Sequence, residues 1–280
     1  MAAQRPFKVY ISVDMEGIAG VVTAEQLGPG GFEYQRFREF MTTEALAAVT
    51  AAKQAGATEI VVSDSHGNGQ TLLIERFPSD VTIIRAWPRP LGMMEGIDST
   101  FSAAIFIGYH SSTANPTGVR AHTFSSANYA GFRANGKEVS EGGWNAMIAG
   151  HFGVPVVLIS GDESAIADLK AVAPDAEVAI VKHSISFHSA ATATPQSAEA
   201  LIKLKAGQGL ERRAQIKPVA RAGAVTIDLT FKSYMPALVL SYLPLFTRTG
   251  SHSIRFPAKD VVEASRIMQF IGSYEPGLTP

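Results

Sequence analysis

The sequence predicts an α/β fold with three layers, α/β/α, around a largely parallel central sheet, and a smaller C-terminal α+β lobe. Strand patterns alternate with helical patterns along the chain, which is typical of βαβ units with parallel strands. One strand candidate, residues 103–108, is nearly all apolar, as expected of a strand that is buried on both faces. Polar residues directly follow several strands, so we expect the functional side chains beyond the carboxyl ends of the sheet.

The first strand ends in two carboxylates. Val9, Ile11 and Val13 alternate with more polar residues, which is the period of a β-strand. Asp14 and Glu16 follow, and they project to the same side if the extended path continues, because side chains repeat every second residue. Two acids on one side repel each other unless a positive charge lies between them. A divalent metal ion supplies that charge, and a pair of solvated acids in a turn is the alternative.

Two later strand ends carry histidines. Residues 33–55 have apolar side chains three or four apart and are followed by Gly56, where a helix C-cap belongs, so they predict a helix lying on the sheet. Strands are predicted at 59–63, 82–85 and 103–108. His66 follows the first of these strands and His110 follows the last. Both histidines are therefore expected at the same sheet edge as the two acids.

A hairpin and a helix follow. The dipeptide Asn135-Gly136 is the strongest short-range signal for a hairpin turn, and residues 137–140 are predicted to form the returning strand. Glu141 is then placed at a strand end, before a helix at 144–151, where Asn145 could help to orient it. The later pattern predicts strands at 155–160, 177–181, 224–231 and 254–257 and helices at 162–171, 196–206 and 258–272. We expect one α/β domain over 1–280, with a possible C-terminal lobe at about 220–280 beyond a polar boundary at 207–223.

Composition and charge exclude several classes of protein. Of the 280 residues, 46% are hydrophobic and 18% are charged, and no apolar run approaches the roughly 20 residues of a membrane helix, so we expect no membrane contact. The net charge is −1, and Lys and Arg are scattered along the sequence, so no basic cluster indicates nucleic-acid binding. There is no cysteine and no apolar secretory segment before the first strand, so we expect a cytoplasmic protein whose metal ligands can only be His, Asp and Glu.

The first half of the chain supplies a candidate metal centre. Its members are Asp14, Glu16, His66, His110, His122 and Glu141. Taken singly, each has an ordinary interpretation, because a lone histidine is more often a structural or surface residue than a ligand. Together, carboxylates and imidazoles suit zinc, manganese or iron, and a bridging aspartate with further acids and histidines suits two ions about 3.5–4 Å apart.

Several motifs carry a family resemblance. Those in the candidate centre are SVDMEG at 12–17, SDSH at 63–66, GYH at 108–110, AH at 121–122 and the E-x-x-x-N of 141–145. Those elsewhere are MEGID at 94–98, GVPVVLISGD at 153–162 and AKD at 258–260. Together they resemble the DppA-type D-aminopeptidases, a family of zinc metallopeptidases, over nearly the whole chain.

The resemblance implies an enzyme, a D-stereospecific metallo-aminopeptidase with two zinc ions per subunit, acting on short peptides with an N-terminal D-amino acid. By carry-over, Asp14 bridges the ions, Glu16 and His110 complete one site, and His66 and Glu141 complete the other. His122 matches the family's catalytic histidine, described as a nucleophile, and a general base or proton shuttle stays open. Family members assemble as two stacked five-membered rings, so a homodecamer is implied too.

Other features have more than one interpretation. Asp64 could orient a metal-bound imidazole or cap its own turn. The unusually apolar segment 234–246 could line the substrate entrance or form a subunit contact. The remaining histidines are interpreted as surface or core-edge residues because no acid is spaced to complete a metal site with them; they are His151, His183, His188 and His252.

Two other functions are compatible with the same residues. One is a different hydrolase with two metal ions, such as an amidase or a phosphoesterase, because the ligands define the ions better than they define the scissile bond. The other is a metal-containing protein that binds peptides without cutting them.

Overall fold

The computed structural model describes residues 6–221 and 223–274. Its main feature is a seven-stranded sheet in the order β3-β2-β1-β4-β7-β8-β9. The strands are β1 (Lys8–Val13), β2 (Glu59–Asp64), β3 (Val81–Ile84), β4 (Ala103–Tyr109), β7 (Val156–Asp162), β8 (Glu177–Ser186) and β9 (Ser189–Thr192). Neighbouring strands are parallel except for the antiparallel pair β8 and β9. The predicted, largely parallel central sheet is therefore confirmed.

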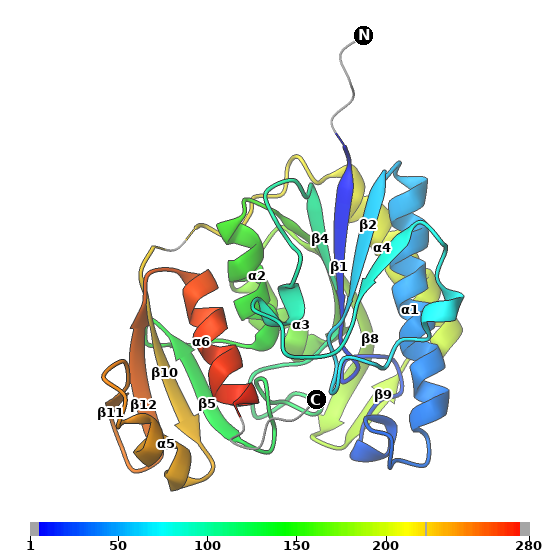
Figure 1. The fold of residues 1–280 in the computed structure, drawn as a ribbon. Helices are drawn as coiled ribbons and strands as arrows, with labels where there is room; N and C mark the ends of the chain where they lie inside the picture. Colours follow the sequence, from blue (N-terminus) through cyan, green and yellow to red (C-terminus); the bar gives the residue numbers. More distant parts are fainter. Residues whose placement is uncertain (1–5, 222, 275–280) are drawn as a thin grey trace.

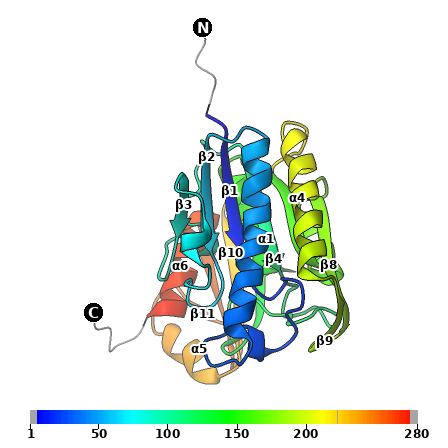
Figure 2. The same ribbon diagram turned by 90° about the vertical axis from the view of Figure 1, so that its right-hand side faces the viewer.

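Helices cover both faces of this sheet (Figure 1). On one face lie α1 (Tyr34–Gln54) and α4 (Pro195–Glu211), which run side by side (Figure 2). On the other face lie α2 (Glu141–His151) and α3 (Glu163–Lys170). The side chains of β1 alternate between the two cores: Val9 and Ile11 pack on the side of α1, and Tyr10 packs on the side of α2. This alternation produces the predicted three layers, with about 1.5–3 kcal/mol gained for each large apolar side chain that is fully buried.

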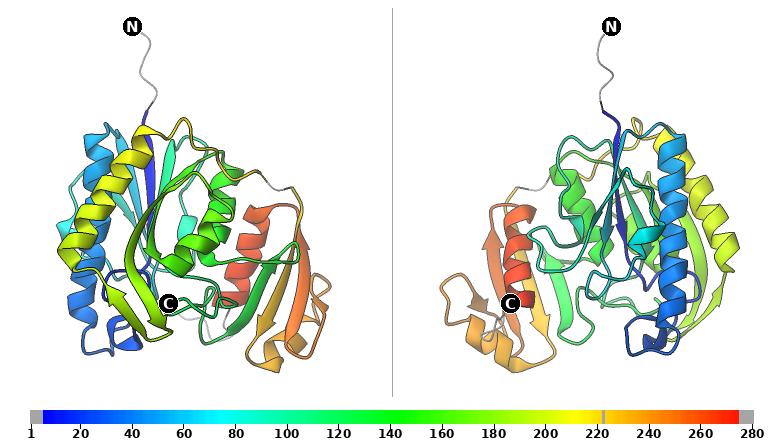
Figure 3. Two further views of the ribbon diagram at one scale, coloured as in Figure 1. Left: turned by 180° about the vertical axis from the view of Figure 1, so that it is seen from behind. Right: turned by 45° about the vertical axis from the view of Figure 1, so that its right-hand side comes forward.

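A second, antiparallel sheet of five strands lies beyond α2 (Figure 3). Its order is β11-β12-β10-β5-β6, with β5 (Tyr129–Ala134), β6 (Lys137–Glu138), β10 (Val225–Phe231), β11 (Thr247–Arg248) and β12 (Ser253–Ala258). Helix α6 (Val261–Ser273) contacts both this sheet and α2, and the short helix α5 (Tyr234–Leu240) contacts β10 and β12. Strands β5 and β6 precede the segment 220–280, so the second sheet joins two distant parts of the chain.

The turn of the β5-β6 hairpin is the predicted one, but the strand after it is shorter than predicted. Asn135 and Gly136 have φ values of 51° and 76°, the left-handed region that favours these two residue types in a hairpin turn. Strand β6 ends at Glu138, and Ser140 begins the next helix by accepting a hydrogen bond from Gly143 N at 3.1 Å. Glu141 is therefore the first residue of α2 and not the end of a strand.

The C-terminal half contains elements that were not predicted. Strand β8 extends to Ser186, five residues beyond its predicted end, and forms a hairpin with β9. Helix α5 and strand β11 were also missed. Helix α6 begins at Val261 because Asp260 caps it, accepting a hydrogen bond from Glu263 N at 2.9 Å. Within the described ranges, no helix combines the length and the apolar character needed to cross a bilayer.

Candidate metal centre

The loop after β1 is interlocked with the end of β4. Asp14 N donates to Ile107 O at 2.8 Å, and Gly17 N donates to Gly108 O at 2.7 Å. A Cβ atom on Gly17 would lie 2.1 Å from Tyr109 O, and one on Gly108, whose φ is +71°, would lie 2.2 Å from Asp14 O. Only glycine fits at these two positions, and this close approach brings both acids of the loop to the end of β4.

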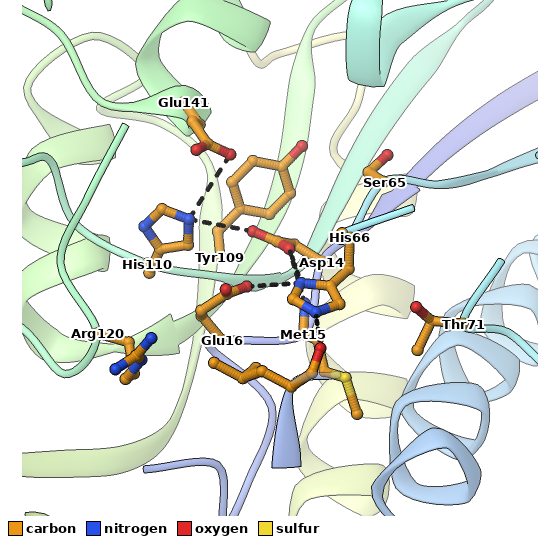
Figure 4. A network of polar contacts seen from close by, with 12 residues as sticks. Asp14, Met15, Glu16, Ser65, His66, Thr71, Tyr109, His110, Arg120 and Glu141 are labelled. Atoms are coloured by element: carbon orange, nitrogen blue, oxygen red, sulfur yellow. Dashed lines mark hydrogen bonds and ion pairs between the residues drawn. The ribbon is translucent and has the colours of Figure 1, made fainter. Parts of the chain in front are cut away.

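The six predicted residues meet at this sheet edge. Asp14 and Glu16 follow β1, His66 follows β2 and His110 follows β4. Glu141 comes from the first turn of α2, and His122 comes from the loop between β4 and β5. Figure 4 shows the carboxylates and imidazoles of the β1, β2, β4 and α2 residues pointing toward one another. All six side chains are buried or nearly buried.

Asp14 lies between two histidines. Its Oδ1 is 3.3 Å from His66 Nδ1, and its Oδ2 is 3.3 Å from His110 Nε2. His66 Nδ1 also lies 2.9 Å from Glu16 Oε2, and His110 Nε2 lies 3.6 Å from Glu141 Oε2. The two oxygens of one carboxylate therefore face two separate imidazole and carboxylate pairs, which is the arrangement expected of a bridging ligand.

Each of the three imidazoles is oriented by a backbone carbonyl. His66 Nε2 donates to Leu27 O at 2.7 Å, His110 Nδ1 donates to Ser111 O at 3.0 Å, and His122 Nδ1 donates to Arg120 O at 2.8 Å. Because a carbonyl can only accept, the proton of each neutral ring is on the nitrogen that faces the carbonyl. The other nitrogen faces the carboxylates and is the one available to a metal ion, as in a metal-binding histidine whose outer nitrogen is held in place.

The donor atoms fit divalent metal ions. Asp14 Oδ2 and His110 Nε2 are buried and close, yet neither makes a hydrogen bond to the described residues. Asp14, Glu16 and His110 offer donor atoms within 4.8 Å of one another, and so do His110, His122 and Glu141. Oxygen and imidazole donors without sulfur suit zinc, manganese or iron. His122 is thus placed close enough to be a ligand itself.

Burial and mutual charge shift the pKa values in the centre. Burial, together with the charge of Glu16, raises the pKa of Asp14. Burial opposes ionisation of Glu16 and Glu141 too, but the facing imidazoles hold the pKa of both below the usual range. Burial lowers the pKa of His66 and His110, but the facing carboxylates outweigh it and raise both well above the usual value. Three buried carboxylates need positive charge beside them, and protons or divalent cations can supply it.

A cavity of about 470 Å³ opens beside these residues. Asp14, Glu16, His66, His122 and Glu141 line one end of it. The rest of the wall comes from the loops on either side of β3, the β4-β5 loop, the start of β5, α2 and α6. This volume is within the range of sites for small molecules.

The loop that carries His122 has a strained backbone on both sides of the histidine. Arg120 and Phe124 have φ values of 56° and 60°, the left-handed region that non-glycine residues rarely adopt. Arg120 N donates to Phe187 O at 3.1 Å, and its guanidinium lies 5.2 Å from the centre of the Phe187 ring. Phe124 N donates to Glu141 Oε1. The β8-β9 hairpin and α2 thus hold the His122 loop in an unusual conformation.

The contacts decide between the two interpretations of Asp64 and do not support the predicted role of Asn145. Asp64 Oδ2 accepts a hydrogen bond from Leu72 N at 2.7 Å, and no hydrogen bond joins this carboxylate to His66 in the described chain, so Asp64 holds its own turn. Asn145 donates to Tyr109 Oη at 2.8 Å and to Met93 Sδ at 3.1 Å, so it does not orient Glu141 by a hydrogen bond. Asn145 also lines the cavity.

Lys182 was given no role from the sequence, although it supports the centre. It is 1% exposed and extends from β8 beneath the loop after β1. Its Nζ donates to Glu16 O, to Ile18 O at 3.2 Å and to Val21 O at 2.6 Å. Burial lowers the pKa of Lys182 to about 8, so the side chain is mostly charged at neutral pH. A single lysine on this edge of the sheet carries no sequence signal of such a role.

We expect Lys182→Met to weaken both the fold and metal retention. The three carbonyls lose their donor, so the free energy of unfolding should fall by about 3 kcal/mol. Because the loop carries Glu16, metal affinity should fall about 10- to 100-fold, the usual effect of removing a residue that holds a metal ligand in position. Thermal unfolding and chelator competition measure the two effects.

Lys205→Met is the matched control. Lys205 forms an ion pair with Glu177 at 3.2 Å near the surface, so its loss should cost no more than about 1 kcal/mol. If Lys182→Met has the melting temperature of the native protein and keeps its metal, the loop after β1 does not need Lys182 for support.

Comparisons with known proteins agree with the motifs. The model of the D-aminopeptidases, peptidase family M55, matches residues 7–270. A D-aminopeptidase of Bacillus subtilis (strain 168) is 33% identical over 262 residues, covering 93% of this chain and 95% of the relative. A solved structure, the Zn-dependent D-aminopeptidase DppA from Bacillus subtilis, a self-compartmentalizing protease, has a TM-score of 0.90 at 32% identity and covers 95% of this chain and 97% of its own. The similarity therefore extends over both sheets.

Proposed function

Because this chain belongs to the D-aminopeptidase family, we propose that it is a zinc-dependent enzyme that removes N-terminal D-amino acids from short peptides. The observation that carries the proposal is the convergence of three carboxylates and three imidazoles at one end of a cavity of about 470 Å³. Such a cavity has room for a short peptide, and its charged end has the donor set of a zinc peptidase.

Five residues would hold two zinc ions. Asp14 would be shared, since its two oxygens face His66 and His110 at 3.3 Å each. Glu16 and His110 would complete one site, which agrees with the donors of Asp14, Glu16 and His110 lying within 4.8 Å of one another. By the family resemblance, His66 and Glu141 would complete the other, whereas the shortest contacts pair His66 with Glu16 at 2.9 Å and His110 with Glu141 at 3.6 Å. A bound zinc pair supplies Lewis-acid polarisation of the scissile carbonyl and lowers the pKa of water.

His122 would transfer the proton. Its Nε2 lies 3.8 Å from Glu141 Oε1 and 4.0 Å from Glu16 Oε1, while its Nδ1 is held by Arg120 O. At 13% exposure its side chain is more open to the cavity than those of His66 (7%) and His110 (1%). An oriented imidazole with a free lone pair beside the bound peptide can accept a proton during attack and return it to the leaving amine.

The test compares D-alanine and L-alanine p-nitroanilides, with and without a chelator. The proposal expects cleavage of the D-anilide in zinc, little cleavage of the L-anilide, and loss of activity on chelation. If both anilides stay intact while p-nitrophenyl phosphate is hydrolysed, the protein is a phosphoesterase. Peptide binding without turnover of any substrate would favour a binding protein instead.

We also propose that copies of the chain assemble through an apolar patch around α5, in a decamer of two stacked pentameric rings. The patch, called here the α5 patch, consists of six large side chains that are 41–72% exposed: Tyr234, Met235, Val239, Tyr242, Leu243 and Leu245. Contiguous exposed apolar side chains of this size mark interaction sites. The structural neighbour is a self-compartmentalizing protease, which supports a second copy as the occupant.

Tyr242→Glu is expected to break this assembly. Tyr242 is 72% exposed, so the substitution should leave the subunit folded while placing a charge in the contact. Light scattering after size exclusion should show a smaller particle. Phe32→Glu, which alters an 82% exposed side chain next to α1, is the control and should keep the native mass. An unchanged mass for Tyr242→Glu would exclude the α5 patch as the contact.

We further propose that the protein works in the cytoplasm. It has no cysteine, which is compatible with a reducing compartment. Fractionation of the source cells tests this proposal, and recovery of the protein with secreted or membrane markers would contradict it.

A further inference from the structure

Asn145 lies one helical turn after Glu141 on α2 and lines the cavity. Residues four apart on a helix have neighbouring side chains, with Cβ atoms about 5–6 Å apart. Asn145 is only 1% exposed, and the accessible part of its side chain faces the cavity that it lines. A buried amide beside a candidate metal ligand is therefore in reach of a bound molecule.

The neighbours of Asn145 fix which way its amide points. Its Nδ2 donates to Tyr109 Oη at 2.8 Å and to Met93 Sδ at 3.1 Å. Tyr109 has a single hydroxyl proton and donates it to Ser12 Oγ at 2.7 Å, so its oxygen is left to accept from the amide. With Nδ2 against two acceptors, Oδ1 takes the opposite position, where it makes no hydrogen bond to any described residue.

The cavity offers few other partners for a positive charge. Apart from the proposed zinc ligands and His122, every described residue of its wall has a neutral side chain; examples are Ser125, Asn128 and Gln269. An aminopeptidase has to recognise the α-ammonium of its substrate, and the carboxylates of the centre would be occupied in holding zinc. A neutral oxygen can serve without adding a fourth negative charge to three buried carboxylates.

We propose that Asn145 Oδ1 accepts a hydrogen bond from the α-ammonium group of the substrate, which makes Asn145 a specificity residue for free N-termini. The inference rests on the proposed aminopeptidase function. In such a substrate the ammonium nitrogen is two bonds from the scissile carbonyl carbon, so its acceptor has to lie beside the metal ligands. Asn145, one turn from Glu141 and anchored by Tyr109, satisfies that requirement.

The experiment compares two inhibitors that differ only in the amino group, D-alanine hydroxamate and propionohydroxamate, on zinc-loaded native protein and on Asn145→Leu. The inhibition constant of D-alanine hydroxamate should rise about 10- to 100-fold in Asn145→Leu, the usual range for a hydrogen bond to a charged group. That of propionohydroxamate should not change. Asn145→Ser keeps a neutral acceptor oxygen and should restore part of the affinity for D-alanine hydroxamate. Zinc content should stay at the native level in both variants.

Gln269→Leu is the matched control, because it removes an amide that lines the same cavity from another helix, α6. It should change the two inhibitors to the same extent. If Asn145→Leu weakens both inhibitors equally, Asn145 only shapes the cavity and the inference is wrong; no change for either inhibitor also overturns it. If Asn145→Leu does not fold, Asn145→Ala is used in its place. Failure of the proposed function gives a different result: the native protein itself would not cleave the D-alanine anilide.

Discussion

Asp14→Ala is expected to lose its metal and its activity together. The carboxylate faces His66 with one oxygen and His110 with the other, so its removal takes a ligand from both proposed sites. Zinc content should fall from two ions to less than one per subunit. Metal catalysis contributes several kcal/mol to transition-state stabilisation, and each 1.36 kcal/mol is tenfold in rate, so kcat/KM should fall by about 10³-fold or more.

Metal analysis after dialysis measures the first effect, and turnover of the D-alanine anilide measures the second. Asp64→Asn is the control. Asp64 is also a buried acid at a strand end, but it holds its own turn through Leu72 N at 2.7 Å. This variant should be less stable by about 1–3 kcal/mol and still bind zinc. Native metal content in Asp14→Ala would show that Asp14 does not bridge the ions.

His122→Ala is expected to separate metal binding from catalysis. If His122 transfers a proton, the variant keeps two zinc ions while kcat falls by about 10²- to 10⁴-fold, the usual contribution of general acid-base catalysis. Metal content and single-turnover rates, measured on the same preparation, distinguish the two properties.

His183→Ala is the matched control for this variant. His183 lies on the β8-β9 hairpin, 67% exposed, and contacts only Glu163 among the ionisable groups described, at 3.6 Å. It should behave as the native protein does. Loss of both zinc and turnover in His122→Ala would instead show that His122 is a metal ligand. The donor atoms of His110, His122 and Glu141 lie within 4.8 Å of one another, which is compatible with that role.

The sheet and much of the candidate centre were predictable because they depend on local patterns. Strand periodicity located β1, β2 and β4, and the rule that ligands bind beyond the carboxyl ends of parallel strands placed Asp14, His66 and His110 together. The three-layer fold and the family are confirmed, the family by a match over residues 7–270. The roles of the individual ligands and of His122 stay predictions.

Contacts between distant parts of the chain were not predictable. Lys182 reaches Glu16 O across 166 residues, and no local pattern announces such a contact. The exposed strand β9 and the short helix α5 have weak periodicity because tertiary packing, more than intrinsic propensity, stabilises them. Glu141 was placed one element too early because the capping role of Ser140 was not recognised in the sequence.

The cavity is built from parts of the chain that lie far apart in the sequence. All proposed zinc ligands lie between residues 14 and 141, whereas one wall of the cavity comes from Ser265, Met268 and Gln269 on α6. Mutations in the last fifty residues can thus alter which peptide fits while the donor set is left intact. Substitutions on α6 would therefore change the shape of the cavity without removing any of the proposed zinc ligands.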